Sequence, residues 1–251
     1  MNFFILEKEP ESFLELERKL RTKDVVLIGP DVKNIEVIKF LERHKIPYLG
    51  PSPLSFSFYQ NKDIAKDILK NSGLNVADWL VLKRGEEYAI SAKRVVNSFP
   101  PPWLVLPINK IARDFLELTS LIGFSFRDYE KIIVEEYIEG KRAFCGVLEN
   151  FRREDYYALP VVEEDIFCPA GFSLEIKKEI EAMAKMAHRA LNLRYYSGHT
   201  FLVSKDKKDN PKIYFHDFHF NPLLHNKKSL EAVGLDHKDF LNHLINLATR
   251  R

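Results

Sequence analysis

Two polar side chains near the end of the chain have the types and the spacing of metal ligands. Asp217 and His219 lie two residues apart in Lys212–His219, an aromatic-rich stretch that predicts a strand. Side chains at this spacing point to the same face of a sheet. A carboxylate and an imidazole on one face could bind a divalent cation, and imidazole favours zinc, manganese or iron over magnesium. The alternative is that His219 is an ordinary hydrogen-bonded residue and that no metal binds.

A lysine at the start of a predicted helix is a second candidate. The stretch Asn61–Asn71 predicts a helix, with Asn61 placed to cap it and Gly73 just beyond its end. A cation in the first turn is disfavoured because the positive end of the helix dipole lies there. A phosphate partner would explain Lys62 at this place, whereas otherwise Lys62 is simply an exposed lysine.

The elements that must position these residues begin with an alternating pattern. Strands are predicted at Phe3–Leu6, Asp24–Pro30 and Ile46–Leu49, and helices at Glu11–Arg21 and Val32–His44. The first fifty residues therefore read β-α-β-α-β, which is typical of a small parallel sheet.

Strict alternation stops after residue 100. The stretches Ala143–Leu148 and Tyr156–Val162 predict an antiparallel pair, Leu174–Leu191 the longest helix, and Arg194–Ser204 a strand that pairs with Lys212–His219. Parallel βαβ units thus come first and antiparallel sheet with flanking helices follows, so the predicted fold class is α/β followed by α+β. The remaining predicted strands and helices are Trp79–Leu82, Trp103–Leu106, Ile132–Glu136, Glu86–Ser98 and Asp236–Thr249.

Composition and charge exclude several classes of partner. The 251 residues carry 38 basic and 36 acidic side chains, a net charge of +2, which gives no reason to expect nucleic acid or an anionic membrane. The apolar runs Val25–Gly29 and Trp103–Ile108 are far shorter than the ~20 residues of a membrane span. Cys145 and Cys168 match no zinc or redox spacing and no signal peptide is recognisable, so we expect a cytoplasmic location. The amphipathic final helix could support a homodimer.

Five short motifs, in consistent order from about residue 24 to the C-terminus, resemble the ATP-grasp superfamily and, within it, the D-alanine–D-alanine ligases. They are Ile46–Ser52 with Asn61–Lys62, Val134–Gly140, Leu159–Glu163, Phe167–Gly171 and Ile213–Pro222. The resemblance implies an ATP-grasp fold with a truncated N-terminal parallel βαβ domain, the pre-ATP-grasp domain, over residues 1–52. The ATP-grasp domain would cover residues 53–251, with subdomains at about 53–136 and 137–251.

The resemblance also implies a reaction and its cofactors. The family makes an amide by phosphorylating a carboxylate with ATP and letting an amine attack the acyl phosphate. Lys62 stands where the family places its first phosphate lysine. Asp217 takes the place of a metal-binding glutamate and His219 that of an asparagine. The implied cofactors are ATP and magnesium or manganese, and the implied substrate is a small molecule, an amino acid or another carboxylate.

The adenine would be bound by a hinge formed by Glu135, Glu136, Tyr137 and Ile138. By the resemblance, the Glu135 carboxylate accepts a hydrogen bond from the adenine amino group, and the Ile138 backbone bonds the ring. The alternative is an ordinary strand with alternating apolar residues. An acid that would hold the ribose hydroxyl groups is replaced by Arg142, whose guanidinium cannot accept a hydrogen bond.

Several positions depart from the family pattern. Leu106 stands in place of the second phosphate lysine, and Lys110 is either a nearby replacement or a solvated side chain. The following stretch, Ile108–Ser120, contains no glycine, so a backbone cradle for phosphate is hard to build there. Thr200 stands where a further carboxylate is expected, and Gly198 where the family has an arginine that binds substrate.

These departures lead to two functional hypotheses. The first is an ATP-dependent carboxylate–amine ligase with an altered substrate and weakened or lost activity. The second is a non-catalytic relative that binds a nucleotide or a metabolite. A third, weaker hypothesis is a partner subunit of a complete ligase. The segment Val162–Phe167 is also too short to hold the family's mobile loop over the substrates.

Overall fold

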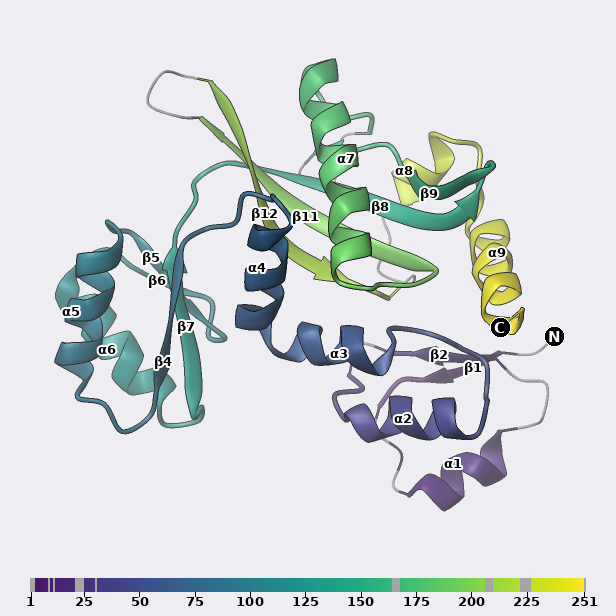
Figure 1. Cartoon of the computed structure of the whole chain (residues 1–251), viewed down its shortest axis with the longest axis horizontal. Helices are drawn as coiled ribbons and strands as arrows, with labels where there is room; N and C mark the ends of the chain where they lie inside the picture. The colour runs from purple at the N-terminus through teal and green to yellow at the C-terminus, as the bar shows by residue number, and fades with distance from the viewer. Residues whose placement is uncertain are drawn as a thin grey trace. The chain divides into compact units, whose positions relative to one another are not determined.

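The computed structural model describes residues 3–8, 10, 12–20, 25–29, 31–163, 168–205, 210–221 and 227–250. It divides the chain into two compact units. Unit 1 comprises residues 1–74 and 141–251, and unit 2 comprises residues 75–140. Figure 1 shows the elements of each unit. The domain bounds expected from the sequence, 1–52 and 53–251, stay a prediction.

Unit 1 begins with a parallel three-stranded sheet, sheet A, in the order β1-β2-β3. Its elements are β1 (Phe3–Leu6), α1 (Phe13–Lys19), β2 (Val25–Ile28), α2 (Ile35–Arg43) and β3 (Tyr48–Leu49). This confirms the predicted β-α-β-α-β order. Two further helices follow, α3 (Pro53–Gln60) and α4 (Lys62–Asn71). The sequence predicted α4 but not α3.

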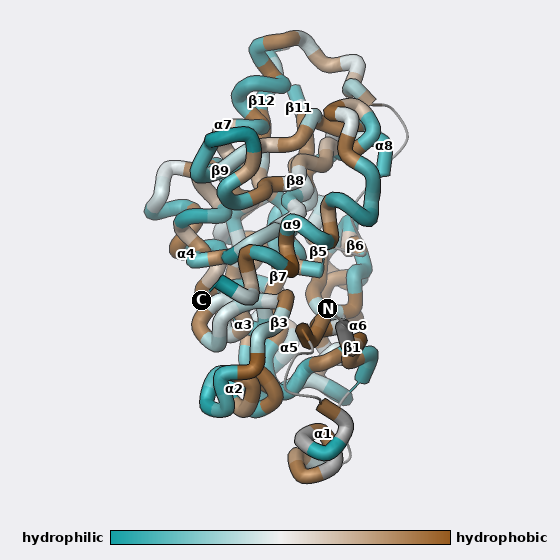
Figure 2. Tube along the Cα trace, turned by 90° about the vertical axis from the view of Figure 1, so that its right-hand side faces the viewer, coloured by the Kyte–Doolittle hydropathy of each residue, from teal (hydrophilic) through white to brown (hydrophobic). Residues whose placement is uncertain are grey.

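Strand β2 is buried on both faces, which explains its continuous apolar run. Val26 and Ile28 belong to a core cluster with α2, while Val25 and Leu27 belong to another that includes Phe240. Phe240 lies on α9 (His237–Thr249), which begins at its N-cap Asp236. Hydrophobic and hydrophilic residues alternate around α2 and α9, as the colours in Figure 2 show. Each helix therefore covers sheet A with an apolar face.

The second part of unit 1 is an antiparallel sheet, sheet B, in the order β10-β8-β11-β12, with β9 also paired to β8. The strands are β8 (Lys141–Phe151), β9 (Glu154–Ala158), β10 (Val162–Glu163), β11 (Tyr196–Lys205) and β12 (Pro211–His219). Helix α7 (Leu174–Ala190) packs against it, and α8 (Lys227–Glu231) precedes α9. The antiparallel pairing predicted for Ala143–Leu148 and Tyr156–Val162 is confirmed, but the second stretch is not a single strand. Two short strands form there, separated by Pro160, which has no N–H to donate.

Unit 2 is an antiparallel sheet, sheet C, in the order β4-β7-β5-β6, covered by two helices. Its elements are β4 (Trp79–Lys83), α5 (Tyr88–Ser98), β5 (Trp103–Leu106), β6 (Lys110–Ala112), α6 (Phe115–Ser125) and β7 (Lys131–Glu136). Apolar residues of α5 and α6, such as Val95 and Ile122, form one core with Val105 and Val134 of the sheet. The sequence missed β6 and α6, which together occupy most of the glycine-free stretch Ile108–Ser120.

A chain of hydrogen-bonded polar side chains crosses the buried interface between α7 and sheet B. Ser197 Oγ lies 2.6 Å from His188 Nδ1 and 2.7 Å from His199 Nε2, and all three residues are fully buried. His188 Nε2 lies 3.3 Å from Glu149 Oε1. Burial lowers the pKa of His199 well below its ordinary value, and the nearby His188 and His219 lower it further. His199 is therefore neutral in the folded chain.

Unit 1 should lose stability as the pH falls below about 6.5, the ordinary pKa of histidine. There the unfolded chain takes up a proton at His199 and the folded chain does not, so the free energy of unfolding decreases. Between pH 7.5 and 5.5 the unchanged chain should lose about 1.4 kcal/mol more than the variant His199→Gln. Urea unfolding followed by far-UV circular dichroism measures this difference.

The chain supplies its own control for this experiment. Its two tryptophans, Trp79 and Trp103, both lie in unit 2, so their fluorescence reports on the surroundings of that unit's side chains. A fluorescence transition separate from the circular dichroism transition should show the same pH dependence in both proteins. Equal pH dependence of the circular dichroism signal as well would show that His199 does not titrate as described.

Candidate functional site

A bulge in β12 sets the direction of the predicted metal ligands. Thr200 of β11 pairs with Asp217, whereas the next residue, Phe201, pairs with Phe215, so His216 is the extra residue. Without the bulge, Phe215 and Asp217 would share a face. The bulge instead places Asp217 beside Thr200 and leaves Phe215 on the opposite face with Phe201. His219 pairs with Gly198, two residues from Thr200, and therefore shares a face of sheet B with Asp217.

The predicted phosphate lysine lies beside the predicted metal ligand. Lys62 is the first residue of α4, and its Nζ lies 2.9 Å from Oδ2 of Asp217. The other carboxylate oxygen, Oδ1, accepts a hydrogen bond of 2.9 Å from the backbone N–H of Phe218. The two side chains are 41% and 40% exposed, so this ion pair is open to solvent. Two residues 155 positions apart thus meet at the end of β12.

Sequence reasoning missed Tyr59, which lies beside this pair. Its ring makes edge contacts with Phe218 and Phe220, with centroid distances of 5.8 and 5.0 Å. Burial raises the pKa of Tyr59, the charge of Asp217 raises it further, and Lys62 opposes both effects. Tyr59 lies in the unpredicted helix α3. Its signal was present in the sequence, because Ser52 caps α3 and a proline follows at the first helical position.

The imidazole of His219 occupies space that a side chain at position 198 would need. A Cβ atom on Gly198 would lie 2.2 Å from Nε2 and 2.6 Å from Cε1 of His219. The imidazole stacks on the ring of Phe144, with a centroid distance of 5.7 Å and an interplanar angle of 14°. Burial lowers the pKa of His219, while the charge of Asp217 and a hydrogen bond with the Asn221 backbone oppose this.

The donors present suit a divalent cation that also binds phosphate. Over the described part of the chain, no three His, Cys, Asp or Glu side chains gather as a metal site. Magnesium, however, is commonly bound through one or two carboxylates together with substrate phosphates and water, rather than by protein alone. Asp217 fits that mode, and the His219 imidazole shifts the preference towards manganese or zinc.

The predicted adenine hinge lies in unit 2. Glu135 is on β7 between Trp79 and Leu104 of the neighbouring strands and is only 4% exposed. The N–H of Glu136 donates to Asp78 O over 2.8 Å, and that of Tyr137 donates to Pro102 O over 3.0 Å. The Tyr137 side chain is exposed. These backbone bonds attach the end of β7 to the chain segments on both sides of it, at Asp78 and at Pro102.

Ile138 follows the strand and is half-buried. The sequence-predicted roles of the hinge residues stay predictions. Of the departures from the family pattern, Leu106 is the half-buried last residue of β5, and Lys110 is exposed on β6, opposite Val105.

A buried carboxylate that sequence reasoning did not single out holds the start of β8. Glu163 is 6% exposed, and its Oε1 lies 2.6 Å from Lys141 Nζ while Oε2 accepts a 2.8 Å bond from Gly171 N–H. The hydrogen bond from Lys141 lowers the pKa of Glu163, and the Gly171 bond adds to this against the effect of burial. Lys141 directly follows the hinge motif. The adjoining residues 164–167, which include most of the segment predicted to be too short for a mobile loop, lie outside the described residues.

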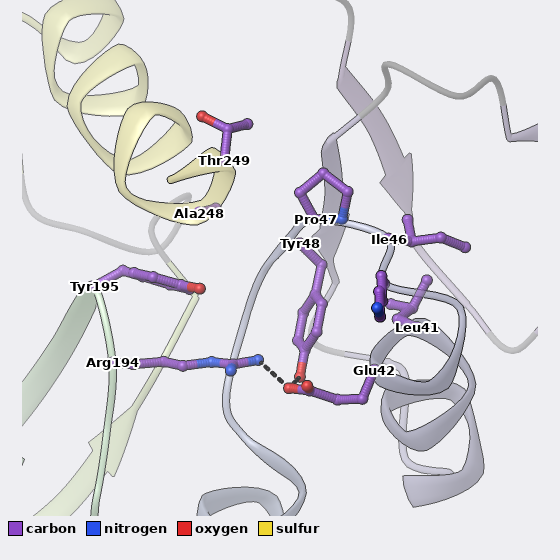
Figure 3. Close-up of a pocket in the computed structure, with 10 residues that line it drawn as sticks. Leu41, Glu42, Ile46, Pro47, Tyr48, Arg194, Tyr195, Ala248 and Thr249 are labelled. Carbon is purple, nitrogen blue, oxygen red and sulfur yellow. Dashed lines mark hydrogen bonds and ion pairs between the residues drawn. The ribbon is translucent and has the colours of Figure 1, made fainter. Parts of the chain in front are cut away.

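A separate cavity of about 490 Å³ in unit 1 contains none of the predicted site residues (Figure 3). Arg194 crosses it: Nη2 lies 3.0 Å from Glu42 Oε1, and Nε donates to Gly50 O over 3.2 Å. The guanidinium carbon also lies 4.5 Å from the centre of the Tyr48 ring. These contacts connect sheet A to the start of β11, which indicates a structural role for Arg194.

Comparison with known proteins identifies similar chains. No protein-family model matches the sequence. The D-alanine–D-alanine ligase of Wigglesworthia glossinidia brevipalpis is 28% identical over 228 residues, which cover 80% of this chain and 63% of that enzyme. The D-alanine–D-alanine ligase of Desulfotalea psychrophila is 27% identical over 245 residues, covering 84% and 73%. The chain thus matches less than two thirds of the length of the first relative.

The structure agrees with the sequence relatives. A crystal structure of D-alanine–D-alanine ligase from Bacillus anthracis, in complex with ATP, superposes with a TM-score of 0.79 at 23% identity. The match covers 96% of this chain and 84% of that structure. The predicted ATP-grasp fold and the resemblance to D-alanine–D-alanine ligases are therefore confirmed. Among the described helices, none has the length and apolar character to span a membrane.

The fit between Gly198 and His219 gives a stability prediction. Gly198→Ala should lower the free energy of unfolding of unit 1 by roughly 1–3 kcal/mol, because the rings of His219 and Phe144 must move. In the double variant with His219→Asn, a shorter side chain frees the space, so most of this loss should disappear. Urea unfolding of the two single variants and the double variant measures the coupling. Strictly additive losses would contradict the described contact.

Proposed function

Because the chain has the fold of D-alanine–D-alanine ligases and is similar to them in sequence, we propose that it is an ATP-dependent carboxylate–amine ligase. Its substrate would be a small carboxylate, an amino acid or a related molecule, other than D-alanine, and its activity would be weaker than that of the relatives. The observation that carries the proposal is the convergence of Lys62 and Asp217 at the end of β12, 2.9 Å apart. A cytoplasmic location and a homodimer belong to the same proposal.

Each proposed contact with ATP belongs to a described element. Lys62 would bind phosphate oxygens, since an ammonium at the start of α4 lies next to backbone N–H groups that also favour anions. In unit 2, Glu135 would accept from the adenine amino group, and the segment Glu136–Ile138 would bind the ring. Asp217 and His219 would hold magnesium or manganese, which when bound supplies positive charge to the triphosphate.

The weakened activity follows from the positions that lack charge. A hydrogen bond to a charged group contributes about 1.5–3 kcal/mol, and each ~1.4 kcal/mol in a barrier is a factor of ten in rate. A leucine at position 106 in place of a lysine therefore costs roughly 10–100-fold. Thr200 and Gly198 remove a further carboxylate and a guanidinium from the same face of sheet B. The losses at Thr200 and Gly198 would not simply add, because substitutions at neighbouring positions are coupled.

The second candidate is a non-catalytic relative that binds a nucleotide or a metabolite without turnover. It is favoured by the side chains on the face of sheet B that carries Asp217 and His219. Gly198 carries no charge where the relatives would bind substrate with an arginine, and the partly buried imidazole of His219 covers it. ADP release separates the two candidates.

ATP with manganese should raise the melting temperature of the chain. A ligand at 100 times its dissociation constant stabilises the folded state by about 2.7 kcal/mol, which thermal unfolding detects readily. Lys62→Ala should reduce the shift, whereas Lys70→Ala, in the exposed last turn of the same helix, should not. An undiminished shift in Lys62→Ala would contradict the role of Lys62.

The same proteins decide whether the chain is a ligase. ADP release should depend on an added amino acid or other carboxylate and should fall by roughly 10–100-fold in Lys62→Ala. ATP binding without ADP release in a broad substrate screen would support the non-catalytic alternative. Absence of any ATP-dependent shift would contradict the ligase and would leave only a relative that binds a metabolite other than ATP.

A further inference from the structure

We propose that Lys62 and a divalent cation compete for the carboxylate of Asp217, so that the ammonium holds the place of the cation until an anion draws it away. This inference rests on the proposed function, because it concerns the same candidate metal site. It adds a coupling between two ligands: an anion that binds Lys62 frees Asp217 for the metal.

The two oxygen atoms of Asp217 have different partners. Oδ1 accepts the backbone N–H of Phe218 at 2.9 Å, which fixes the carboxylate within its own strand. Oδ2 lies 2.9 Å from Lys62 Nζ. A magnesium ion would need to approach a carboxylate oxygen to about 2.0–2.1 Å. At Oδ2 it would meet the ammonium within a few ångströms, and two cations that close repel each other strongly.

The ion pair is weak enough to open. Both side chains are about two-fifths exposed, and pairs of this kind contribute little to stability because water screens them. The lysine has a flexible four-carbon stem, so its ammonium can move while α4 stays in place. A phosphate group offers it more negative charge than one carboxylate does.

Removal of the ammonium would open Oδ2 of Asp217 to a cation, while Oδ1 keeps its hydrogen bond from Phe218. Asp217 and His219 share a face of sheet B, and the His219 ring is held by its stacking on Phe144. The cation would then meet the Asp217 carboxylate without repulsion from the ammonium. The displaced lysine keeps the anion in place, so anion and metal should assist each other's binding.

The test is manganese binding to the full-length chain, measured by electron paramagnetic resonance of free Mn²⁺ without nucleotide, which would itself chelate the metal. Lys62→Met keeps most of the aliphatic stem and removes the charge. It should bind Mn²⁺ about tenfold or more tightly than the unchanged chain, since one repelling unit charge is gone. Lys70→Met makes the same change of net charge at the other end of α4 and should leave the affinity unaltered.

Sulfate provides the anion, because it mimics a phosphate group and chelates Mn²⁺ only weakly. In sodium sulfate, against sodium chloride at equal ionic strength, the unchanged chain should bind Mn²⁺ more tightly and Lys62→Met should show no such gain. Asp217→Asn should abolish the tight binding in the Lys62→Met background.

The outcomes separate this inference from the proposed function. Equal Mn²⁺ affinity in the unchanged chain and Lys62→Met, lost in Asp217→Asn, would overturn the competition and leave the metal site intact. Absence of Mn²⁺ binding in every variant would overturn both the competition and the metal site. An equal gain in Lys70→Met would show a general charge effect and would also overturn the competition.

Discussion

The candidate site depends on one irregularity, the bulge at His216. In a regular strand the apolar residues Ile213 and Phe215 would share a face with Asp217. Burial of the two apolar side chains would then also bury the Asp217 carboxylate. The bulge separates them by adding one residue to β12. Phe215 and Phe218 can then both pack on the α7 side of sheet B. Asp217 lies on the opposite face, which also carries Thr200 and His219.

The position of Lys62 depends in turn on aromatic packing. Helix α3 carries Phe56 and Tyr59, whose rings contact Phe220 just beyond β12. Because α4 follows α3 after a single residue, these contacts hold the first turn of α4 at the end of β12. An exposed ion pair could not position two elements by itself, since its contribution to stability is small. The packed rings of Phe56, Tyr59 and Phe220 do so, and the charged groups then meet over a short distance.

The sequence was sufficient for the parts of the fold governed by local pattern. The alternation of the first fifty residues, the helix after Asn61 and the strand pair β11–β12 all follow from periodicity and turn residues. The predicted cap is wrong in one respect: the Asn61 side chain makes no capping hydrogen bond and instead donates to Ser57 O. Helix α3 was not predicted, despite the start signal at Ser52 and Pro53, because its pattern is barely amphipathic.

The site was predictable only in part. The shared face of Asp217 and His219 follows from their spacing, but the bulge does not, because no residue type in β12 announces it. The match of Gly198 with His219 is a relation between two strands and cannot be seen in either one alone. The role of Glu163 was not predicted, because its partners Lys141 and Gly171 lie far from it in the sequence. Only the pairing of β8 with β10 brings Lys141 close to it.

The two-sided burial of β2 has a consequence for synthesis. One face of this strand is covered by α2, which leaves the ribosome shortly afterwards, but the other is covered by α9, more than two hundred residues later in the chain. The apolar surface of Val25 and Leu27 therefore stays partly uncovered until α9 has been synthesised. Contacts of such long range slow folding and expose intermediates to aggregation, so the nascent N-terminal region is a natural client for chaperones.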